Sequence, residues 1–276
     1  MRLFLLLLAA CSGSTTGDDT STGDADADTD TDTDTDADTD ADTDTDTDPR
    51  DAIISGTVLL WDGSPAAEME VQVCSIQCRY AITDASGNFS QGLLESARFK
   101  VDAIGAVYSS PGFGNALVGV DLGVSENFVI SAPLVVPPVS GPVSVSETAG
   151  RATYDVGAVS LTFAATDLAF TFGVVDNDTG LFDLYAGALE GAAIPQLWSV
   201  QPSFVVTFLP WAAENTGTLD VTVTGLTSPD GSYTVYALEE YGEVEGPLGT
   251  ATVSGGTATA TGLAPSHLTW LMFVPA

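Results

Sequence analysis

The sequence has very few basic residues. Lys and Arg together number six and His one, against 38 Asp and Glu in 276 residues. A protein that binds nucleic acid needs a basic surface that displaces counterions from the phosphates, so this composition excludes a nucleic-acid partner. It also disfavours attachment to anionic lipid through a charged patch. We therefore expect any link to a membrane to be covalent.

Bases for catalysis are scarce as well. An activated Ser, Thr or Cys needs a nearby base, and His267 and Lys100 are the available choices. We expect His267 to be a surface or strand-edge residue and Lys100 to face solvent. Glu239 and Glu240 form the densest acidic pair, but adjacent strand residues point to opposite faces and would not act together. The chain is therefore predicted not to be an enzyme, with a carboxylate-based glycosidase as the enzymatic alternative.

The first apolar run is too short to span a membrane. Leu3 to Ala10 would extend about 12 Å as a helix, against about 30 Å of hydrocarbon. The run follows Arg2 and ends in small residues, which is typical of a secretory signal. Its end, Leu8-Ala9-Ala10-Cys11, resembles the lipobox of bacterial lipoproteins. That resemblance implies that residues 1–10 are a lipoprotein signal peptide and that Cys11 carries the lipid.

Residues 11–51 are predicted to be a disordered acidic spacer. From Asp24 to Asp48 every second residue is Asp, with Thr or Ala between, so nothing here can build a core. In an extended chain the carboxylates would lie about 6.6 Å apart, which is inside the Debye length, so they repel and stiffen the tract. A calcium site would need turns and glycines that the tract lacks after Gly23. We interpret the tract as a stalk.

Residues 52–138 have strand patterning, with turn signals between the alternating runs. Their motif residues are Ile54-Ser55-Gly56-Thr57-Val58, Asp62-Gly63-Ser64-Pro65, Val71 and Val73, Thr83-Asp84, Gly87, Phe89, and Phe99-Lys100-Val101. Together these resemble the carboxypeptidase regulatory-like domain. The resemblance implies a small, non-catalytic, transthyretin-like β-sandwich of an exported protein. Gly63 and Gly87 are expected to permit tight hairpins and Phe89 to fill the core.

Cys74 and Cys78 flank three residues at an expected hairpin turn. They would face each other across its neck, and an oxidising compartment would favour a disulfide. Strict alternation along the two strands suggests that a bulge is needed to bring them together. Zinc binding by the pair is a poor alternative because zinc needs four ligands.

Residues 139–276 are predicted to form a second β-sandwich, after a Pro-rich boundary near residue 139. One segment, residues 182–189, could be a short helix. Asp176, Asp178 and Asp183 surround a turn that contains Gly180 and form the candidate calcium site, although an ordinary hairpin turn explains the same residues. No other cofactor is expected. The fold class is thus all-β, with two tandem β-sandwich domains after a disordered acidic linker.

The four tryptophans, Trp61, Trp198, Trp211 and Trp270, are the aromatic residues that could hold a ligand. Core packing is the ordinary role of each, and Trp61 beside the Asp62-Gly63 turn is the one expected to be exposed. We predict a lipid-anchored protein of the cell envelope, on the outer membrane, that displays non-catalytic binding or adhesion modules to envelope proteins or polysaccharide. A structural spacer or scaffold without a small ligand is the alternative.

Overall fold

The computed structural model describes residues 52–93, 97–105, 112–124, 126–170, 174–195 and 197–276. Within these ranges the regular elements are β-strands and two single 3-10 turns, and there is no α-helix. The prediction of an all-β chain is confirmed. Cys11 and the acidic spacer of residues 11–51 lie outside the described residues, so the predictions about them stay predictions.

The short helix predicted over residues 182–189 is wrong. This segment lies inside strand β13 (Leu181–Glu190). Phe182 and Leu184 are buried while Leu181 and Asp183 are exposed, which is the period of two that a half-buried strand requires. The strand pairs with neighbours on both edges, so tertiary pairing overrides the helix-forming Ala and Leu of the segment.

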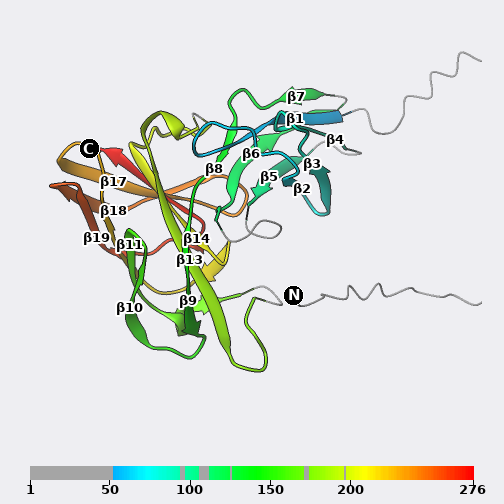
Figure 1. Cartoon of the computed structure of the whole chain (residues 1–276). Coiled ribbons are helices and arrows are strands. Elements are labelled where there is room, and N and C mark those ends of the chain that lie inside the picture. The colour runs from blue at the N-terminus through cyan, green and yellow to red at the C-terminus, as the bar shows by residue number, and fades with distance from the viewer. Residues whose placement is uncertain (1–51, 94–96, 106–111, 125, 171–173, 196) are drawn as a thin grey trace, which may run out of the picture. The chain divides into compact units, whose positions relative to one another are not determined.

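The first eight strands form two four-stranded sheets. One has the order β4-β1-β7, with β8 also pairing to β1, and the other the order β3-β2-β5-β6. Figure 1 shows β1, β4 and β7 lying along one another, and β2, β3 and β5 grouped beneath them. The strand bounds are β1 Ala52–Leu60, β2 Glu70–Cys74, β3 Cys78–Ile82, β4 Asn88–Leu93, β5 Arg98–Ile104, β6 Ala116–Asp121, β7 Asn127–Val129 and β8 Leu134–Val136.

The expected turn and core residues of this region have the expected conformations. Gly63 and Gly87 have φ of +83° and +78°, the left-handed region that glycine adopts without strain. A Cβ at Gly87 would also lie 2.3 Å from the carbonyl oxygen of Val58, so the turn is close-packed. Phe89 is buried between the sheets against Gly56.

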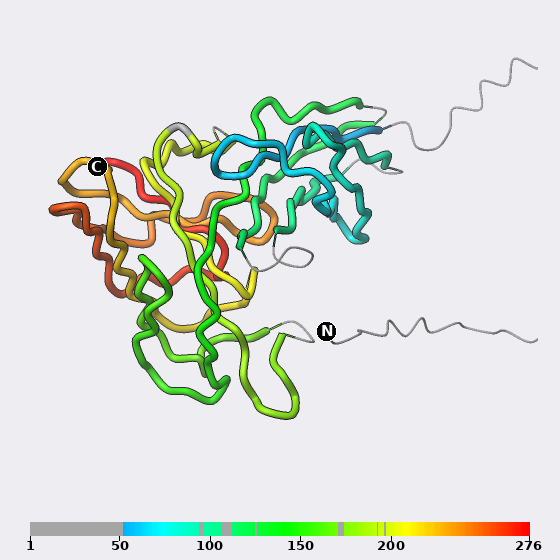
Figure 2. The backbone as a smooth tube through the Cα atoms, viewed as in Figure 1, coloured from blue at the N-terminus to red at the C-terminus, as the bar shows by residue number. Residues whose placement is uncertain are grey.

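Ten of the strands from residue 140 onward form one antiparallel sheet in the order β10-β11-β16-β19-β18-β17-β21-β14-β13-β9. Strand β10 at one end also contacts β9 and β13 at the other, so the sheet curls around its core. Figure 2 shows the chain passing from β8 into β9 as one extended segment. The bounds are β9 Ser140–Ser146, β10 Arg151–Val156, β11 Val159–Ala164, β14 Phe204–Leu209, β16 Leu219–Thr224, β17 Gly231–Leu238, β18 Val244–Ser254, β19 Thr257–Leu263 and β21 Trp270–Pro275.

The other three strands of this region form a small sheet in the order β12-β15-β20 (Leu168–Ala169, Ala213–Asn215 and His267–Leu268). The hydrophobic core crosses the predicted boundary near residue 139. Trp198 and Trp270 lie in the same buried cluster as Ile54 and Phe99 of the first sheets. The indole Nε1 of Trp270 donates to the carbonyl oxygen of Asn115 over 2.9 Å. The two predicted domains therefore share buried surface within one compact unit.

Candidate functional site

Trp61 follows directly after strand β1, at a tight turn. The amide of Gly63 donates to the carbonyl oxygen of Leu60 (2.9 Å), and Asp62 Oδ1 accepts from the hydroxyl (2.6 Å) and amide (2.9 Å) of Ser64. The hydroxyl bond first, and then the amide bond, lowers the pKa of Asp62. The turn thus fixes the backbone that carries Trp61 and places an ionised carboxylate beside it.

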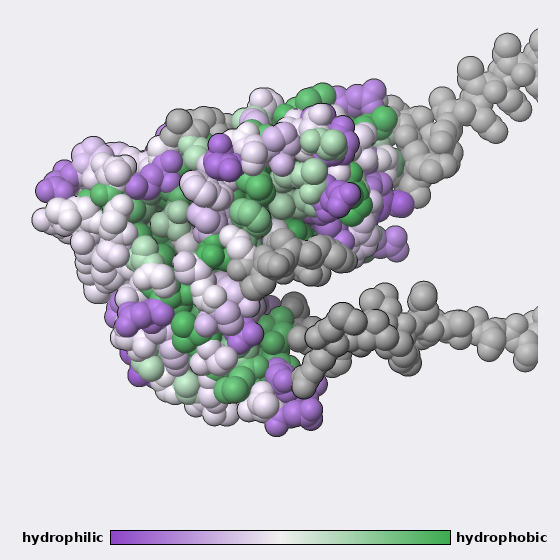
Figure 3. All heavy atoms as spheres, in the orientation of Figure 1, coloured by the Kyte–Doolittle hydropathy of each residue, from purple (hydrophilic) through white to green (hydrophobic). Residues whose placement is uncertain are grey.

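Trp61 is the exposed tryptophan, as the sequence predicted. Its side chain is 48% exposed, whereas Trp198 is 8% and Trp270 0% exposed, and Trp211 is half-buried. Figure 3 shows hydrophobic residues in separate patches between hydrophilic ones on the visible face of the molecule. Single exposed apolar side chains are normal on a protein surface. Trp61 also lines a pocket.

The Trp61 pocket has a volume of about 430 Å³. Its walls are mostly apolar, and Asp62 supplies the charge. A pocket of several hundred Å³ with apolar walls and few polar groups is the usual form of a small-ligand site. The lining residues are Leu59, Leu60, Trp61, Asp62, Gly63, Ala132, Pro133, Val135, Ala193, Ile194 and Pro195.

The aspartates of the candidate calcium site accept hydrogen bonds from separate partners. Asp176 Oδ1 accepts from the amides of Asp178 (2.8 Å) and Thr179 (3.2 Å), as in an ordinary Asx turn. Asp183 Oδ1 instead accepts from the hydroxyl of Ser144 (3.0 Å). Among the described residues, no group of three or more acidic, His or Cys side chains could hold a metal ion. The turn explanation fits these contacts better than a calcium site does.

Asp176 and Asp183 do share a second pocket, of about 500 Å³, with residues from both predicted domains. Strand β13 supplies Leu181, Asp183 and Tyr185, which alternate along one face of the strand. Sequence reasoning missed this pocket because its walls come from segments that are far apart in the chain. They are Ile104, Asn115, Ser144, Val174, Asp176, Thr179, Leu181, Phe182, Asp183, Tyr185, Leu209, Pro210 and Trp211.

The outer face of β5 carries a buried polar cluster that sequence reasoning missed. Lys100 does not face solvent as predicted: its side chain is 12% exposed and its Nζ lies 3.3 Å from Glu240 Oε1. Asp102 is 2% exposed, and burial raises its pKa to about 7 even though Lys100, Asn115 and Trp211 act in the opposite direction. Asn115 and Trp211 favour the ionised form of Asp102. Within the described residues, however, neither Asp102 Oδ1 nor Trp211 Nε1 has a hydrogen bond of ordinary geometry.

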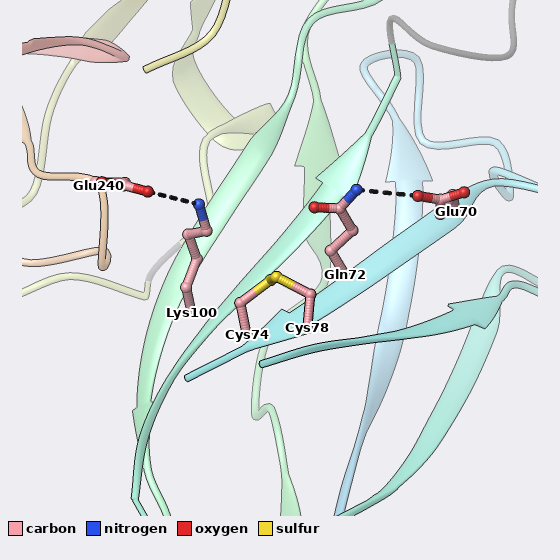
Figure 4. Close-up of a disulfide and its surroundings, with 6 residues drawn as sticks. All are labelled: Glu70, Gln72, Cys74, Cys78, Lys100 and Glu240. Carbon is pink, nitrogen blue, oxygen red and sulfur yellow. Dashed lines mark hydrogen bonds and ion pairs between the residues drawn. A yellow bond between two sulfur atoms is a disulfide. The ribbon is translucent and has the colours of Figure 1, made fainter. Parts of the chain in front are cut away.

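Cys74 and Cys78 form a disulfide in this structure. They are directly paired in a regular β2–β3 ladder, so no bulge is needed: opposed residues of an antiparallel pair share a face. Figure 4 shows the disulfide on the same sheet as the Lys100–Glu240 ion pair. Gln72 Nε2 donates to Glu70 over 3.0 Å beside it. We assign a structural role to the disulfide and to the polar contacts beside it.

Three of the residues singled out in the sequence as possible bases or acids have side-chain partners in the described part of the chain. His267 Nδ1 lies 3.1 Å from its neighbour Ser266 Oγ, on the short strand β20. Glu240 is engaged by Lys100. Within the described part of the chain, no helix is long and apolar enough to span a bilayer.

No protein-family model and no curated protein matches the chain. Among solved structures it is similar to DUF3823 family proteins of Parabacteroides merdae (10% identity, TM-score 0.25, covering 81% of this chain and 98% of that one) and Bacteroides ovatus (10%, 0.24, 77% and 96%). It is also similar to a proposed carbohydrate-binding protein of Bacteroides uniformis (13%, 0.23, 82% and 99%). At TM-scores this low, the likenesses assign no activity to this chain.

Proposed function

We propose that this chain is a non-catalytic, glycan-binding protein of the cell envelope, held by a lipid on Cys11 and displayed on its acidic spacer. One observation carries the glycan part: Trp61 is the exposed tryptophan and lines a pocket with apolar walls. A pyranose ring presents C–H groups on one face, and these pack against an open indole. The hydroxyls at its rim need polar partners, and Asp62 lies at the pocket's edge.

The pocket has the size of a small-ligand site. Its volume of about 430 Å³ falls in the range of cavities that hold small molecules. The turn at residues 60–64 is held by hydrogen bonds, so Trp61 needs little ordering on binding. Preorganisation of this kind favours a ligand that offers only weak individual contacts.

The anchor and the spacer support the location. The resemblance of residues 8–11 to a lipobox implies a lipid at Cys11, and acylation by more than one chain holds a protein stably on a membrane. Ser12 after the cysteine is not the Asp-type retention signal of enteric bacteria, which favours the outer membrane. The spacer of residues 11–51 would then hold the β-sheets away from the lipid surface.

Binding is tested with the full-length protein against an array of envelope polysaccharides and oligosaccharides. We expect native protein to bind a glycan, Trp61→Ala to lose binding, and Tyr80→Ala to keep it. Tyr80 is a matched control because it is an exposed aromatic residue (58%) outside the pocket. Equal binding by native protein and Trp61→Ala would overturn the glycan site, and a blank array would favour the scaffold alternative. Release of new reducing ends would favour the glycosidase.

The anchor is tested separately, by labelling with a radioactive fatty acid in cells that express native protein or Cys11→Ser. We expect label in the native protein alone. Equal label in both would refute the lipoprotein interpretation while leaving the Trp61 experiment unaffected.

A further inference from the structure

The Trp61 pocket combines an apolar interior with a polar opening. Three segments line it: residues 59–63 at the end of β1, residues 132, 133 and 135 at β8, and residues 193–195. Val135 (8% exposed), Ile194 (2%) and Pro195 are buried lining residues, whereas Trp61 and Asp62 are exposed. The deeper part of the pocket is therefore apolar, and the charged group lies at its opening.

Asp62 carries the charge of this pocket, and it acts as a hydrogen-bond acceptor. Among the lining residues that the structure describes, none is Lys, Arg or His. The amides of Leu60, Gly63 and Ser64 donate to partners inside the turn, so they are not free to bind an acidic group of a ligand. An ionised carboxylate accepts hydrogen bonds and donates none. The opening therefore suits a ligand that brings N–H or O–H donors and no negative charge.

The apolar interior restricts which sugar can enter the pocket. A plain hexose carries a hydroxyl group on most of its ring carbons, and a hydroxyl that is buried without a hydrogen-bond partner is costly. The side chains of Leu59, Val135 and Ile194 offer no such partner. A methyl group, in contrast, is stabilised when it leaves water for apolar walls. The pocket is thus complementary to a sugar that presents a methyl group where a plain hexose presents a hydroxyl.

We infer, on the basis of the glycan site proposed above, that the Trp61 pocket selects a neutral, N-acetylated sugar. One N-acetyl substituent supplies both a methyl group for the walls at Val135 and Ile194 and an amide N–H that donates to Asp62. The face of the sugar ring packs on the indole of Trp61. A 6-deoxy sugar has the methyl group without the amide donor, and an amino sugar has the donor without the methyl group.

A matched pair of ligands isolates the N-acetyl group. The β-1,4-linked trimers of N-acetylglucosamine and of glucose share one backbone and differ only at C2, which carries an acetamido group in the first and a hydroxyl in the second. Binding to the full-length protein is measured by isothermal titration calorimetry. We expect the N-acetylglucosamine trimer to bind about tenfold more tightly than the glucose trimer, or better. The glucosamine trimer, titrated in high salt to screen general attraction to the acidic chain, should bind no more tightly than the glucose trimer.

The same titrations distinguish the class of sugar from glycan binding itself. Equal affinity for the two trimers, with both lost in Trp61→Ala, would refute selection of an N-acetyl group and leave the glycan site in place. Tighter binding of an acidic or a 6-deoxy glycan would refute it in the same way. Binding of the N-acetylglucosamine trimer that Trp61→Ala leaves unchanged would place that sugar outside this pocket and overturn the inference. Failure of every glycan to bind would instead refute the proposed function.

Two turn aspartates provide a variant and its matched control. Asp62→Asn keeps an oxygen that can accept from Ser64 but removes the charge and the second carboxylate oxygen. Asp84→Asn makes the same change outside the pocket lining, in a turn where Asp84 accepts from the amides of Ser86 (2.8 Å) and Asn88 (2.9 Å). We expect Asp62→Asn to bind the N-acetylglucosamine trimer several-fold more weakly and Asp84→Asn to bind it like native protein. Equal losses in both, or no loss in Asp62→Asn, would refute the contact with Asp62, and near-ultraviolet circular dichroism checks that each variant is folded.

Discussion

Asp102→Asn should make the protein more stable at neutral and alkaline pH. Asp102 is 2% exposed on β5, and its Oδ1 has no hydrogen bond within the described residues. Burial is the largest influence on this carboxyl and raises its pKa to about 7, against 3.8 for the free group. The folded state therefore holds the proton more tightly than the unfolded chain does. The side-chain amide of Asn has the same shape as the carboxyl group and is neutral without binding a proton.

The sign and size follow from linkage. Between pH 4 and 7 the folded protein binds more protons at Asp102 than the unfolded chain, so this residue's contribution to stability falls as the pH rises. A difference of about three pH units between the pKa of Asp102 in the folded protein and in the unfolded chain corresponds to on the order of 4 kcal/mol of unfolding free energy. Asn also loses the attraction to Lys100, so we expect the variant's advantage above pH 7 to be about 2–4 kcal/mol. Below pH 4 the two proteins should be similar.

The assay is urea unfolding followed by tryptophan fluorescence, at pH values from 4 to 9, for native protein and Asp102→Asn. The quantity of interest is the difference in unfolding free energy between the two at each pH, because the many surface carboxylates titrate alike in both. Asp121→Asn is the control: Asp121 is exposed on the neighbouring strand β6, where it pairs with Arg98 (2.8 Å). A difference that does not change with pH, or a variant less stable at pH 8, would refute the argument from burial.

Three further changes test the fold. Replacing Cys74 and Cys78 with Ser should lower the free energy of unfolding by about 2 kcal/mol, measured by thermal unfolding, because the unfolded chain is no longer held in a short closed loop. Alkylation of both cysteines in unreduced protein would contradict the disulfide. Gly187→Ala should cost more than about 3 kcal/mol, since its Cβ would lie 1.8 Å from a backbone carbonyl oxygen. Glu190→Gln should cost about 1–2 kcal/mol because the Glu190 carboxylate accepts hydrogen bonds from amides and hydroxyls at residues 227–228.

Matched controls isolate these mechanisms. Gly150→Ala adds the same methyl group where nothing lies within 4 Å, so it should be nearly neutral. Glu214→Gln removes an exposed charge on β15 and should change the melting temperature little. If either control destabilised the protein as much as its partner variant, the steric or hydrogen-bond explanation would be wrong.

Patterns in the sequence predicted the strands and turns, which depend on residues that are neighbours along the chain. The alternation around Val71 and Val73 identified a strand, because successive side chains of a strand face opposite sides. The sequence predicts a turn at Gly63 because glycine adopts the backbone angles of tight hairpins without strain, and its φ in the structure is +83°. Trp61, next to that turn, was expected to be exposed for the same local reason, and it is.

Two of the errors share one cause, which is contact between distant segments. Residues 182–189 contain helix-forming Ala and Leu, but pairing with β9 and β14 makes them a strand. Lys100 lies on a strand face that alternation alone assigns to solvent, yet Glu240, 140 residues later in the chain, covers it. Asp102, two residues further along the same face of β5, is buried as well.

The sequence by itself determined the all-β class, the strong negative charge and the positions of the tight turns, since composition, the period of two and glycine φ angles are local properties. It also carries the resemblances on which the anchor at Cys11 and the spacer are proposed. Only the tertiary structure decided which acidic side chains are buried and which line a pocket. Asp102 and Asp183 are both polar residues of strands, and their different surroundings depend on which distant segments pack over each strand face.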